Sequence, residues 1–492
     1  MLLQELLDGI PGIKLEGDPR TQILGIAYDS RRVKTGDLFV VLKGAKTDGL
    51  LFIDEALARG AAALAADRVL DPKPGIARLT VPDARKFLAE AARAIFQDPA
   101  AHMRLIAITG TNGKTTTSYL VDAIFRQAGL RSCLVGTLGM RIGDQPFPSA
   151  HTTPEASDLT AFLHEAREAG CTYGSLEISS HALVMRRVFG TRFEVAVFSN
   201  LTPEHLDFHN DMESYYQAKH LLFAPEGANT VKTAVINIDD PYGHRLASEI
   251  AGPVVGYGFS AEAGIRVLDC HMGIEGTGLR LSTPAGEMSI RARLAGRPNI
   301  YNMMAAAGAA LSLGIDPHFV RLGIESLHGV PGRLEPVRGG QDFAVIVDYA
   351  HTPDALEKLL ETVRQLAPGR MAAVFGCGGD RDRKKRPLMG EIATRLSDFV
   401  VATSDNPRSE NPQQILAEIE PGLKMGAAAY QLQPDRREAI RSALAWARKG
   451  DVVVIAGKGH EDCQIIGAQV FPFDDRTVAL ELIHEMLNVQ GD

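Results

Sequence analysis

The stretch Ile108–Thr117, which reads ITGTNGKTTT, indicates the fold of the domain that contains it. It overlaps the apolar run LIAITG, which is typical of a parallel strand buried on both faces, and it leads into a predicted helix. In such a strand–loop–helix, glycines let backbone N–H groups approach phosphate oxygens, and the helix N-terminus adds partial positive charge. We expect Lys114 to reach the terminal phosphates of a nucleotide and Thr115 to place its hydroxyl on Mg²⁺.

The loop is a variant of the strict phosphate-binding pattern, because that pattern has glycine where this chain has Ile108. The alternative is a glycine-rich turn with a chance lysine, but strand, glycines, lysine and threonines all agree with the first interpretation. The predicted phosphate-binding residues are Gly110, Thr111, Asn112, Gly113, Lys114, Thr115 and Thr116.

Apolar runs recur on both sides of this loop, with helical stretches between them. This alternation indicates βαβ units and a doubly wound, mostly parallel sheet. The later predicted strands are Gly174–Ile178, Val195–Phe198, Thr233–Ile238, Ala344–Val347, Met371–Phe375, Phe399–Thr403 and Val452–Ile455. Near the N-terminus we predict strands at Ile23–Tyr28 and Leu38–Leu42, a helix at Ile53–Ala66 and a loop at Asp71–Gly75.

The length and the composition suggest three domains. A chain of 492 residues corresponds to about three domains. The texture changes near Met103 and again at Gly329–Pro336, so we predict an N-terminal domain at 1–100, a central domain at 101–335 and a C-terminal domain at 336–492. All three are expected to be α/β, the central one doubly wound around the phosphate loop and the last one Rossmann-like.

The composition excludes several classes of protein. Hydrophobic residues make up 45% and charged residues 23%, which are globular values, and the net charge of −8 disfavours a nucleic-acid binder. The five cysteines include no C-x-x-C pair, so neither a disulfide framework nor a zinc site is expected. The N-terminus has no signal-peptide pattern, and no apolar run reaches the roughly 18 residues that cross a bilayer. We expect a cytoplasmic enzyme without membrane insertion.

Two residues at strand ends are candidate metal ligands beside Thr115. Glu177 ends a predicted strand, where a carboxylate faces the ligand crevice of a doubly wound sheet. His205 follows the next strand, in SNLTPEHLDFH. Because Mg²⁺ prefers oxygen ligands, chemistry alone leaves open that His205 is only a loop histidine that caps a turn.

Lys219 lies in DMESYYQAKHLLF, a predicted helix. Tyr215 precedes it by four residues and Phe223 follows it by four, so the three share one face. Burial on an apolar face lowers a lysine pKa, and a neutral amine can combine with CO₂ to form a carbamate that ligates a metal or holds Mg²⁺ against a triphosphate. The alternative, which spacing alone favours, is a lysine whose ammonium reaches solvent.

With its G-T-N-G-K-T loop, the chain resembles the Mur ligases, the ATP-dependent amino-acid ligases of peptidoglycan synthesis. More distantly it is similar to the folylpolyglutamate synthetases. The resemblance covers the whole chain and implies Glu177 and His205 as metal ligands. It also implies a carbamylated Lys219, since the family's Y-x-x-A-K motif matches residues 215–219. Lys114, Lys219 and His205 are then the expected catalytic residues.

The same resemblance implies contacts to ATP and to a uridine-nucleotide peptide. Asn299, Arg333 and Asp348 match the ATP side, where Arg333 could stabilise charge in phosphoryl transfer, and helix capping is the alternative role of Asn299. The implied substrate contacts are Ser30, Ala45, Lys46, Thr47, His151, Thr152, Thr153, Ser179, Met185 and Arg187. Without the resemblance, the residue types around Ser30 indicate only a polar turn after a strand.

One substrate position departs from the family pattern. The family often has glutamine where this chain has Met185, and a methionine cannot supply an amide hydrogen bond. We expect the neighbouring Arg186 to compensate.

The tetrapeptide Asp405-Asn406-Pro407-Arg408 distinguishes between amino-acid substrates. In the family it accompanies meso-diaminopimelate, whose second carboxylate a guanidinium binds bidentately. Lysine lacks that carboxylate and would leave Arg408 buried and unpaired, which is costly. The matching amino-acid contacts are Arg381, Asp405, Asn406, Pro407, Arg408, Gly457 and Glu461, with Glu461 expected to pair with the distal ammonium. The alternative for the basic run Arg381–Arg386 is a solvated loop.

The resemblance therefore implies an ATP-dependent, Mg²⁺-dependent ligase of cell-wall synthesis, and with it a role in cell shape and division. It would act as a monomer and add meso-2,6-diaminopimelate to UDP-N-acetylmuramoyl-L-alanyl-D-glutamate through an acyl phosphate. A lysine-adding ligase is opposed by Arg408. A folylpolyglutamate synthetase would leave the N-terminal domain unexplained. A phosphate-loop ATPase that serves as a switch would need no amino-acid site.

Overall fold

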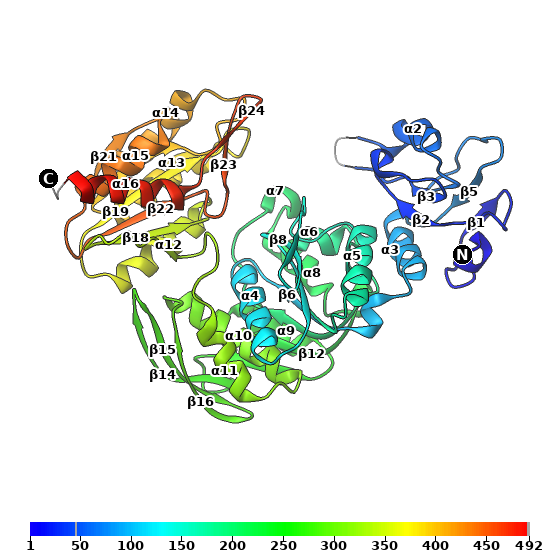
Figure 1. Ribbon diagram of the computed structural model, residues 1–492, viewed down its shortest axis with the longest axis horizontal. Coiled ribbons are helices and arrows are strands. Elements are labelled where there is room, and N and C mark those ends of the chain that lie inside the picture. Colours follow the sequence, from blue (N-terminus) through cyan, green and yellow to red (C-terminus); the bar gives the residue numbers. More distant parts are fainter. Residues whose placement is uncertain (45–46, 490–492) are drawn as a thin grey trace. The chain divides into compact units, whose positions relative to one another are not determined.

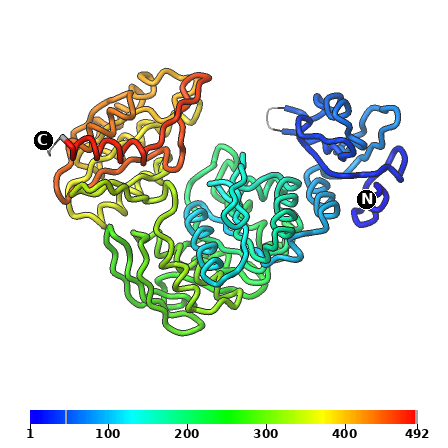
Figure 2. The backbone as a smooth tube through the Cα atoms, in the orientation of Figure 1, coloured from blue at the N-terminus to red at the C-terminus, as the bar shows by residue number. Residues whose placement is uncertain are grey.

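The computed structural model describes residues 1–44 and 47–489. The chain forms two compact units, one of Met1–Arg266 with Met304–Gly323 and the other of Val267–Met303 with Ile324–Asp492. Figure 1 labels their elements, and Figure 2 follows the backbone through both units. Three main sheets with flanking helices confirm the prediction of three α/β domains.

The N-terminal sheet has the order β1-β5-β4-β3-β2, with β1 antiparallel to β5 and the other pairs parallel. Its strands are β1 (Lys14–Glu16), β2 (Gly25–Ala27), β3 (Asp37–Val40), β4 (Ala63–Ala66) and β5 (Ala77–Thr80). The helices are α1 (Leu3–Leu7), α2 (Ile53–Ala58) and α3 (Ala84–Ile95), with 3₁₀ turns η1 (Ser30–Arg32), η2 (Gly49–Phe52) and η3 (Pro99–His102).

The predicted helix at Ile53–Ala66 is wrong in its second half. The helix α2 ends at Ala58, and Gly60 adopts a left-handed φ of +98° that an L side chain rarely takes. Ala63–Ala66 then pair with both β3 and β5 as a buried strand. The alanine-rich composition favours a helix, but tertiary pairing overrides that propensity.

The first unit also contains strands β6–β13 of the central sheet, in the order β13-β12-β11-β6-β10-β7-β8-β9. Its strands are β6 (Arg104–Thr109), β7 (Ser132–Gly136), β8 (Gly139–Ile142), β9 (Gln145–Phe147), β10 (Tyr173–Glu177), β11 (Arg192–Phe198), β12 (Thr230–Asn237) and β13 (Val254–Gly258). The helices are α4 (Lys114–Gln127), α5 (Ala156–Glu168), α6 (Ser180–Val184), α7 (Leu206–His209), α8 (Met212–His220) and α9 (Pro241–Glu249), with the 3₁₀ turn η4 (Pro225–Gly227).

The strand β6 lies between β10 and β11 and is parallel to both, so the order of the sheet reverses at β6. Ligands of open α/β sheets bind beyond the carboxyl ends of the strands at such a reversal. The loop after β6, the end of β10 and the end of β11 therefore meet at the expected ligand crevice.

The second unit contains the C-terminal sheet, in the order β17-β18-β22-β19-β20-β21, with only β17 antiparallel to its neighbour. The strands are β17 (Glu335–Pro336), β18 (Ala344–Asp348), β19 (Met371–Cys377), β20 (Phe399–Ser404), β21 (Ala429–Leu432) and β22 (Val452–Ala456), plus the hairpin β23 (Cys463–Ile466) and β24 (Gln469–Pro472). The helices are α12 (Pro353–Leu366), α13 (Lys385–Leu396), α14 (Pro412–Leu423), α15 (Arg436–Trp446) and α16 (Asp475–Val489).

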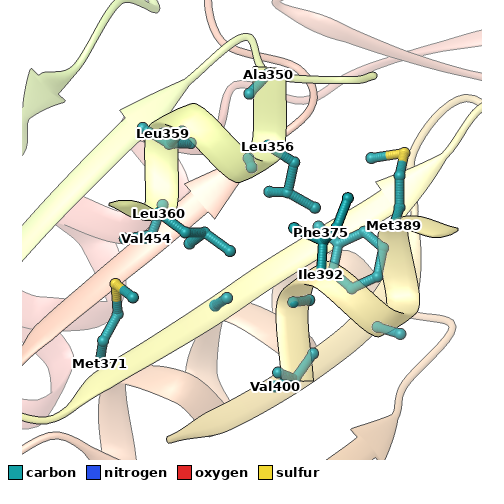
Figure 3. Packing of buried hydrophobic residues seen from close by; sticks show 14 of the residues in the cluster. Ala350, Leu356, Leu359, Leu360, Met371, Phe375, Met389, Ile392, Val400 and Val454 are labelled. Carbon is teal, nitrogen blue, oxygen red and sulfur yellow. The ribbon is translucent and has the colours of Figure 1, made fainter. Parts of the chain in front are cut away.

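Alternate residues of β19 pack on opposite faces of the C-terminal sheet, as the two-residue period of a strand requires. Phe375 lies in the cluster that includes Leu356 of α12 and Met389 of α13, which Figure 3 shows from close by. Val374 lies in the other cluster, against α15 and α16. Helices on both faces explain why β19 reads as one continuous apolar run.

The remaining elements connect these sheets along the chain. They are β14 (Ile265–Gly273), β15 (Gly276–Thr283), β16 (Gly286–Ala292), α10 (Arg297–Ser312) and α11 (Pro317–Ser326). The strands β15 and β16 form an antiparallel hairpin. In the part of the chain that the structure describes, no helix has the length and hydropathy to cross a membrane.

Candidate active site

The phosphate loop joins β6 to α4, as predicted from the sequence. Gly113 precedes the helix with a φ of +88°, and Gly110 has a φ of +142°. A Cβ atom at Gly110 would clash with Ser199 Oγ, so the close approach of the two loops requires glycine there. Lys114 lies over the loop, and its Nζ donates to the carbonyl oxygens of Gly110 and Thr111, each at 2.8 Å.

The loop after β11 supports the phosphate loop through hydrogen bonds that the sequence interpretation missed. Asn112 N donates to Asn200 Oδ1 at 3.0 Å, and Ser199 Oγ donates to Asn112 O at 2.6 Å. Thr111 N donates to Asn200 O at 2.8 Å. The motif SNLTP holds this support, and its position directly after a buried strand was the available signal.

Glu177 and Thr115 lie together, as the metal prediction requires. Thr115 Oγ1 donates to Glu177 Oε2 at 3.0 Å. Thr137, which the sequence interpretation missed, donates to the same carboxylate from its N at 3.1 Å and from its Oγ1 at 3.0 Å. The carboxylate is fully buried, and a Cβ atom at Gly136 would overlap it, so that glycine provides its space.

His205 directly precedes α7 with a left-handed φ of +57°. Its ring centroid lies 4.8 Å from that of His181. Burial lowers the pKa of His205, and the positive charges of Lys114 and Lys219 lower it further, against the opposing effect of Glu204. The imidazole is therefore favoured in its neutral form, which is the form that ligates metals.

The chemistry of this donor set fits Mg²⁺. Thr115 offers a hydroxyl oxygen and Glu177 carboxylate oxygens, the ligand types that Mg²⁺ prefers. Within residues 1–44 and 47–489, no three Cys, His, Asp or Glu side chains group closely enough to hold a metal ion. The other ligands would therefore come from a nucleotide and water, which is usual for Mg²⁺ at phosphates.

Lys219 points from α8 into the protein beneath the phosphate loop. Only 1% of it is exposed, and its Nζ donates to Gly110 O at 2.9 Å and lies 4.7 Å from the centre of the Tyr215 ring. Burial, followed by the charge of Lys114, lowers its pKa well below the usual lysine value. The predicted burial beside Tyr215 is confirmed and the solvent-exposed alternative is wrong. Phe223 lies beyond the end of α8 at His220, so it does not share the helix face.

Thr153 and Ser179 of the predicted substrate loop lie against the strand end that carries Glu177. Thr153 Oγ1 donates to Glu177 O at 2.8 Å and accepts from Ser179 N at 3.1 Å. Thr152 Oγ1 lies 3.1 Å from Thr137 Oγ1, and His151 is exposed. The threonines and Ser179 thus lie near the metal-candidate carboxylate, while His151 remains open to solvent.

Arg187, predicted to meet a substrate anion, already has partners within the chain. Its Nε donates to Glu155 Oε1 at 2.9 Å and its Nη1 to Thr153 O at 2.9 Å. Its Nη2 lies 3.7 Å from Met185 Sδ. Arg186, expected to compensate for Met185, donates from its Nε to Asp83 Oδ2 at 2.9 Å in a part-exposed ion pair, and its compensation stays a prediction.

The predicted uridine-nucleotide contacts are described in part. Ser30 starts the η1 turn and donates from its Oγ to Glu55 Oε2 at 2.7 Å, while Thr47 is exposed. Ala45 and Lys46 lie outside the described residues. A cavity of about 290 Å³ is lined by residues 24–29, by Arg32, Lys34, Asp37 and Phe96, and by residues of α5 that include Asp158.

The predicted ATP-side residues of the second unit have distinct surroundings. Asn299 Nδ2 donates to Ala295 O at 2.8 Å, and because it donates there rather than accepting from a backbone N–H, this bond is not the helix capping named as its alternative. Asp348 accepts from Leu334 N and Ala350 N, each at 2.8 Å, and burial raises its pKa. Arg333 lies over the Tyr349 ring, 5.0 Å from its centre, and its buried Nε has no hydrogen-bond partner among the described residues. An unsatisfied buried donor of this kind fits an anionic ligand.

The predicted amino-acid residues come together at the ends of β20 and β22. Asn406 Nδ2 donates to Glu461 Oε2 at 2.8 Å. Gly457 has a φ of +118°, and a Cβ atom there would lie 2.8 Å from Asp405 Oδ2. Pro407 is buried next to Asn406. Motifs that are far apart along the chain thus meet in one cluster.

Lys458 is the residue of this cluster that the sequence interpretation missed. Its side chain is fully buried, and its Nζ donates to Glu461 Oε2 at 3.0 Å and to Asn406 Oδ1 at 3.2 Å. Glu461 is expected to bind the distal ammonium of the substrate, and one of its oxygens thus already accepts a hydrogen bond from Lys458. The signal was the position of Lys458 beside Gly457 in GKGHE.

A second buried cation supports the same strand ends. Arg436 donates to both oxygens of Asp475, each at 2.7 Å, and both side chains are fully buried. It also donates to Ser404 O and Ala456 O, the last residues of β20 and β22. A buried charge is stable only when it is paired and hydrogen-bonded, and this pair satisfies that condition.

Arg408 and Arg381 lie on neighbouring loops. Arg408 has a left-handed φ of +52°, and its Nη1 donates to Gly379 O at 2.8 Å. Arg381 is exposed, with its Nη1 3.1 Å from Asp380 O. The other arginines of the basic run turn away toward acidic partners, and Arg386 is fully buried, so the solvated-loop alternative is wrong for that residue.

Known proteins similar to this chain match its whole length. It matches the Mur ligase middle domain over residues 108–310, the glutamate ligase domain of Mur ligases over residues 332–459 and the Mur ligase family catalytic domain over residues 22–96.

Two relatives are each named UDP-N-acetylmuramoyl-L-alanyl-D-glutamate–2,6-diaminopimelate ligase. The one from Syntrophomonas wolfei is 47% identical and covers 98% of this chain and 99% of its own length. The one from Gloeobacter violaceus is 48% identical and covers 98% of each chain. A solved structure of the same name has a TM-score of 0.72 at 35% identity and covers 99% of both chains. This chain belongs to the Mur ligase family.

Proposed function

We propose that this protein is the ligase that adds meso-2,6-diaminopimelate to UDP-N-acetylmuramoyl-L-alanyl-D-glutamate with cleavage of ATP to ADP and phosphate, in peptidoglycan synthesis. Full-length relatives bear this name. The observation that carries the choice of amino acid is the Asp405–Arg408 turn, whose Arg408 lies beside the Asn406–Glu461–Lys458 cluster.

Each predicted domain receives one substrate in this proposal. The N-terminal domain, residues 1–100, takes the uridine nucleotide near Ser30 and Thr47. The central domain, residues 101–335, takes ATP at the phosphate loop. The C-terminal domain, residues 336–492, takes the amino acid. The enzyme acts in the cytoplasm as a monomer.

The first chemical step forms an acyl phosphate. The side-chain carboxylate of the D-glutamate attacks the γ-phosphorus of ATP, a P–O bond to ADP breaks, and ADP leaves. Lys114 and the N–H groups at the start of α4 neutralise charge that spreads over the transferred phosphoryl group. Arg333, with its buried unsatisfied Nε, is proposed to stabilise the same charge.

Thr115, Glu177 and His205 would hold Mg²⁺, which neutralises phosphate charge when it is bound. Lys219 is proposed to be carbamylated. Its neutral amine attacks CO₂, a C–N bond forms, and the nitrogen loses a proton to give an anionic carbamate. Burial and the lowered pKa of Lys219 support the neutral amine that this step needs.

The second chemical step forms the amide. The amine of diaminopimelate attacks the acyl carbonyl to give a tetrahedral intermediate, the C–O bond to phosphate breaks, and inorganic phosphate leaves with loss of a proton from nitrogen. Arg408 is proposed to bind the distal carboxylate, and Glu461 the distal ammonium. Because the distal carboxylate and the distal ammonium of diaminopimelate are both held, its attacking amine is oriented, which lowers the entropic part of the barrier.

Omission of substrates one at a time tests this function. Purified protein with ATP, Mg²⁺, the uridine-nucleotide dipeptide and meso-diaminopimelate should release phosphate and form a tripeptide product that mass spectrometry identifies. Omission of any component should stop both. Equal phosphate release without the amino acid would identify an ATPase rather than a ligase.

A further inference from the structure

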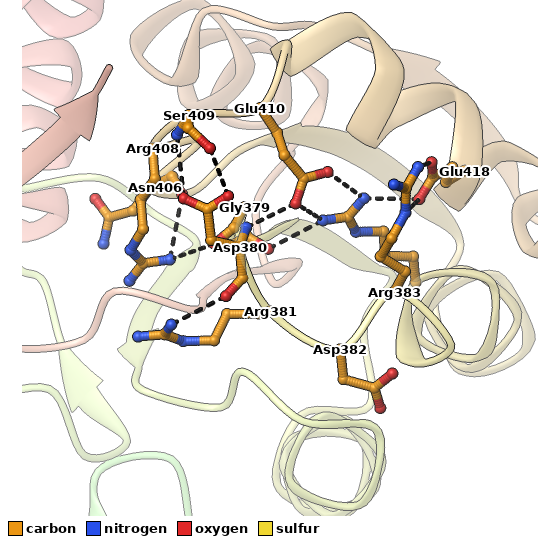
Figure 4. A network of polar contacts seen from close by, with 12 residues as sticks. Gly379, Asp380, Arg381, Asp382, Arg383, Asn406, Arg408, Ser409, Glu410 and Glu418 are labelled. Atoms are coloured by element: carbon orange, nitrogen blue, oxygen red, sulfur yellow. Dashed lines mark hydrogen bonds and ion pairs between the residues drawn. The ribbon is translucent and has the colours of Figure 1, made fainter. Parts of the chain in front are cut away.

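The loop that carries Arg381 and the turn that carries Arg408 are joined by a network of hydrogen bonds and ion pairs next to the buried Arg386, drawn in Figure 4. Glu410 stands between them. Its Oε1 accepts from Asp380 N at 2.6 Å, and its two oxygens accept from the guanidinium of Arg386 at 2.8 and 2.9 Å. One carboxylate therefore connects the main chain beside Arg381 to the segment that follows Arg408.

Asp380 forms the second link between the two segments. Its Oδ1 accepts from Ser409 Oγ at 2.6 Å and its Oδ2 from Ser409 N at 3.2 Å. Asp380 has a left-handed φ of +55°, as does Arg408 at +52°, so both residues hold conformations that side chains rarely adopt. Surrounding contacts must stabilise such conformations, and these hydrogen bonds supply that stabilisation.

Main-chain bonds complete the connection. Gly379 N donates to Asn406 O at 2.9 Å, and Arg408 Nη1 donates back to Gly379 O at 2.8 Å. The guanidinium of Arg408 thus contacts the loop 378–381, and Glu410 holds that loop through its hydrogen bond from Asp380 N. A shift of that loop would move both arginines together.

Arg386 makes the network rigid. It is fully buried, and a buried guanidinium that loses a carboxylate partner is strongly disfavoured. The Arg386 guanidinium holds the pKa of Glu410 at about 2, so the carboxylate stays charged throughout the working range of pH. The ion pair between Arg386 and Glu410 therefore persists throughout that range of pH.

We propose that Glu410, anchored by Arg386, is a positioning residue that sets the selectivity of this site for an amino acid with a second, distal carboxylate. The inference rests on the proposed function. Glu410 itself need not touch the amino acid, and it acts by holding the loop of Arg381 against the turn of Arg408. L-Lysine lacks that carboxylate and does not depend on this geometry.

Glu418 provides a matched control. Like Glu410 it accepts from Arg386, at 2.7 Å, and it also pairs with Arg383. Among the hydrogen bonds of the described residues, it has none to the loop 378–381 or to the turn 405–409. Its loss disturbs Arg386 without releasing either arginine-bearing segment.

The test compares Glu410→Gln with Glu418→Gln in the full-length enzyme with ATP, Mg²⁺ and the uridine-nucleotide dipeptide. We expect Glu410→Gln to lower kcat/KM for meso-diaminopimelate about tenfold or more, mainly through KM, with the KM for ATP unchanged. The ratio of kcat/KM values for diaminopimelate and L-lysine should fall with it. Glu418→Gln should keep that ratio within about twofold of the wild type.

A second variant keeps the inference testable if Glu410→Gln does not fold. Ser409→Ala removes one hydrogen bond to Asp380 at an exposed position and should lower the same ratio by a smaller factor. A wild-type ratio in every folded variant, or equal falls in Glu410→Gln and Glu418→Gln, would overturn the inference. If the wild type itself did not prefer diaminopimelate to lysine, the proposed function would fail instead.

Discussion

The phosphate loop and the amino-acid cluster are built in opposite ways. At the loop, one continuous stretch supplies most groups, and Lys114 and Lys219 both donate to its main-chain carbonyls. At the amino-acid cluster, separate segments meet, because Asn406 contacts Glu461 and the buried Arg386 is held by Glu410. The phosphate loop itself is thus one continuous motif, whereas the amino-acid cluster combines short motifs that are far apart along the chain.

Replacement of Lys219 tests the loop side of this comparison and should have the largest effect. Lys219→Ala removes a buried amine that contacts Gly110 O, and with it the proposed carbamate. We expect turnover to fall about 10²–10³-fold, as for loss of one preorganised charged group. Phosphate release measures this fall, and added formate or acetate should restore part of the activity.

Lys232→Ala is the control for that variant, because Lys232 is an exposed lysine paired with Glu194 at the surface. It should retain full activity. Undiminished turnover in Lys219→Ala would remove Lys219 from the mechanism, and a loss that short carboxylates leave unchanged would contradict the carbamate.

Replacement of Arg408 tests the amino-acid side. Arg408→Ala should lower kcat/KM for meso-diaminopimelate about 10–100-fold, the cost of a lost charged hydrogen bond, while the value for L-lysine changes little. Arg383→Ala is the control, since Arg383 belongs to the same basic run but pairs with Glu418. Equal losses for both amino acids would mean that Arg408 supports the fold of the cluster and does not read the second carboxylate.

The contrast between the two sites also explains what the sequence could predict of the fold. The buried strands β6, β10, β11 and β19 and the phosphate loop are predicted correctly, because strand burial and glycine-dependent turns leave local patterns. The helix at Ile53–Ala66 is wrong beyond Ala58, since pairing of Ala63–Ala66 between two strands has no local signal in an alanine-rich run.

Site predictions followed the same division. Contact of Thr115 with Glu177 followed from residues at strand ends, and burial of Lys219 followed from its helix and the family's Y-x-x-A-K motif. Arg187, by contrast, is paired with Glu155, and Glu461 with Asn406, because the partner of a side chain across a long stretch of sequence depends on tertiary structure. Whether each predicted contact residue binds its substrate stays a prediction for the experiments above and below.

Lys458→Met also tests the amino-acid cluster, and we expect a smaller effect than for Arg408→Ala. The variant keeps the length of the side chain but removes the donor that fixes Asn406 Oδ1 and Glu461 Oε2. We expect kcat/KM for diaminopimelate to fall about tenfold with the KM for ATP unchanged, which steady-state kinetics can measure. Lys449→Met, at an exposed lysine, is the control. A matching loss in ATP affinity would contradict a local role.

The smallest expected effect concerns pH and the second unit. Burial, followed by the charge of Arg333, lowers the pKa of His460 from 6.5 to about 4. A histidine whose folded pKa is lowered contributes stability above pH 6.5 that is lost as the pH falls toward 4, because the unfolded chain takes up the proton first. His460→Gln should therefore lose less thermal stability than the wild type between pH 7 and pH 5. Equal losses in unfolding temperature would contradict this assignment.

The most direct test of the account is the selectivity of the wild-type enzyme, measured as kcat/KM for meso-diaminopimelate and for L-lysine with saturating ATP and uridine-nucleotide dipeptide. The account predicts a preference for diaminopimelate of at least about 100-fold, as expected for a site whose arginine binds the second carboxylate and has no such partner when lysine is bound. Equal values, or a preference for lysine, would contradict it.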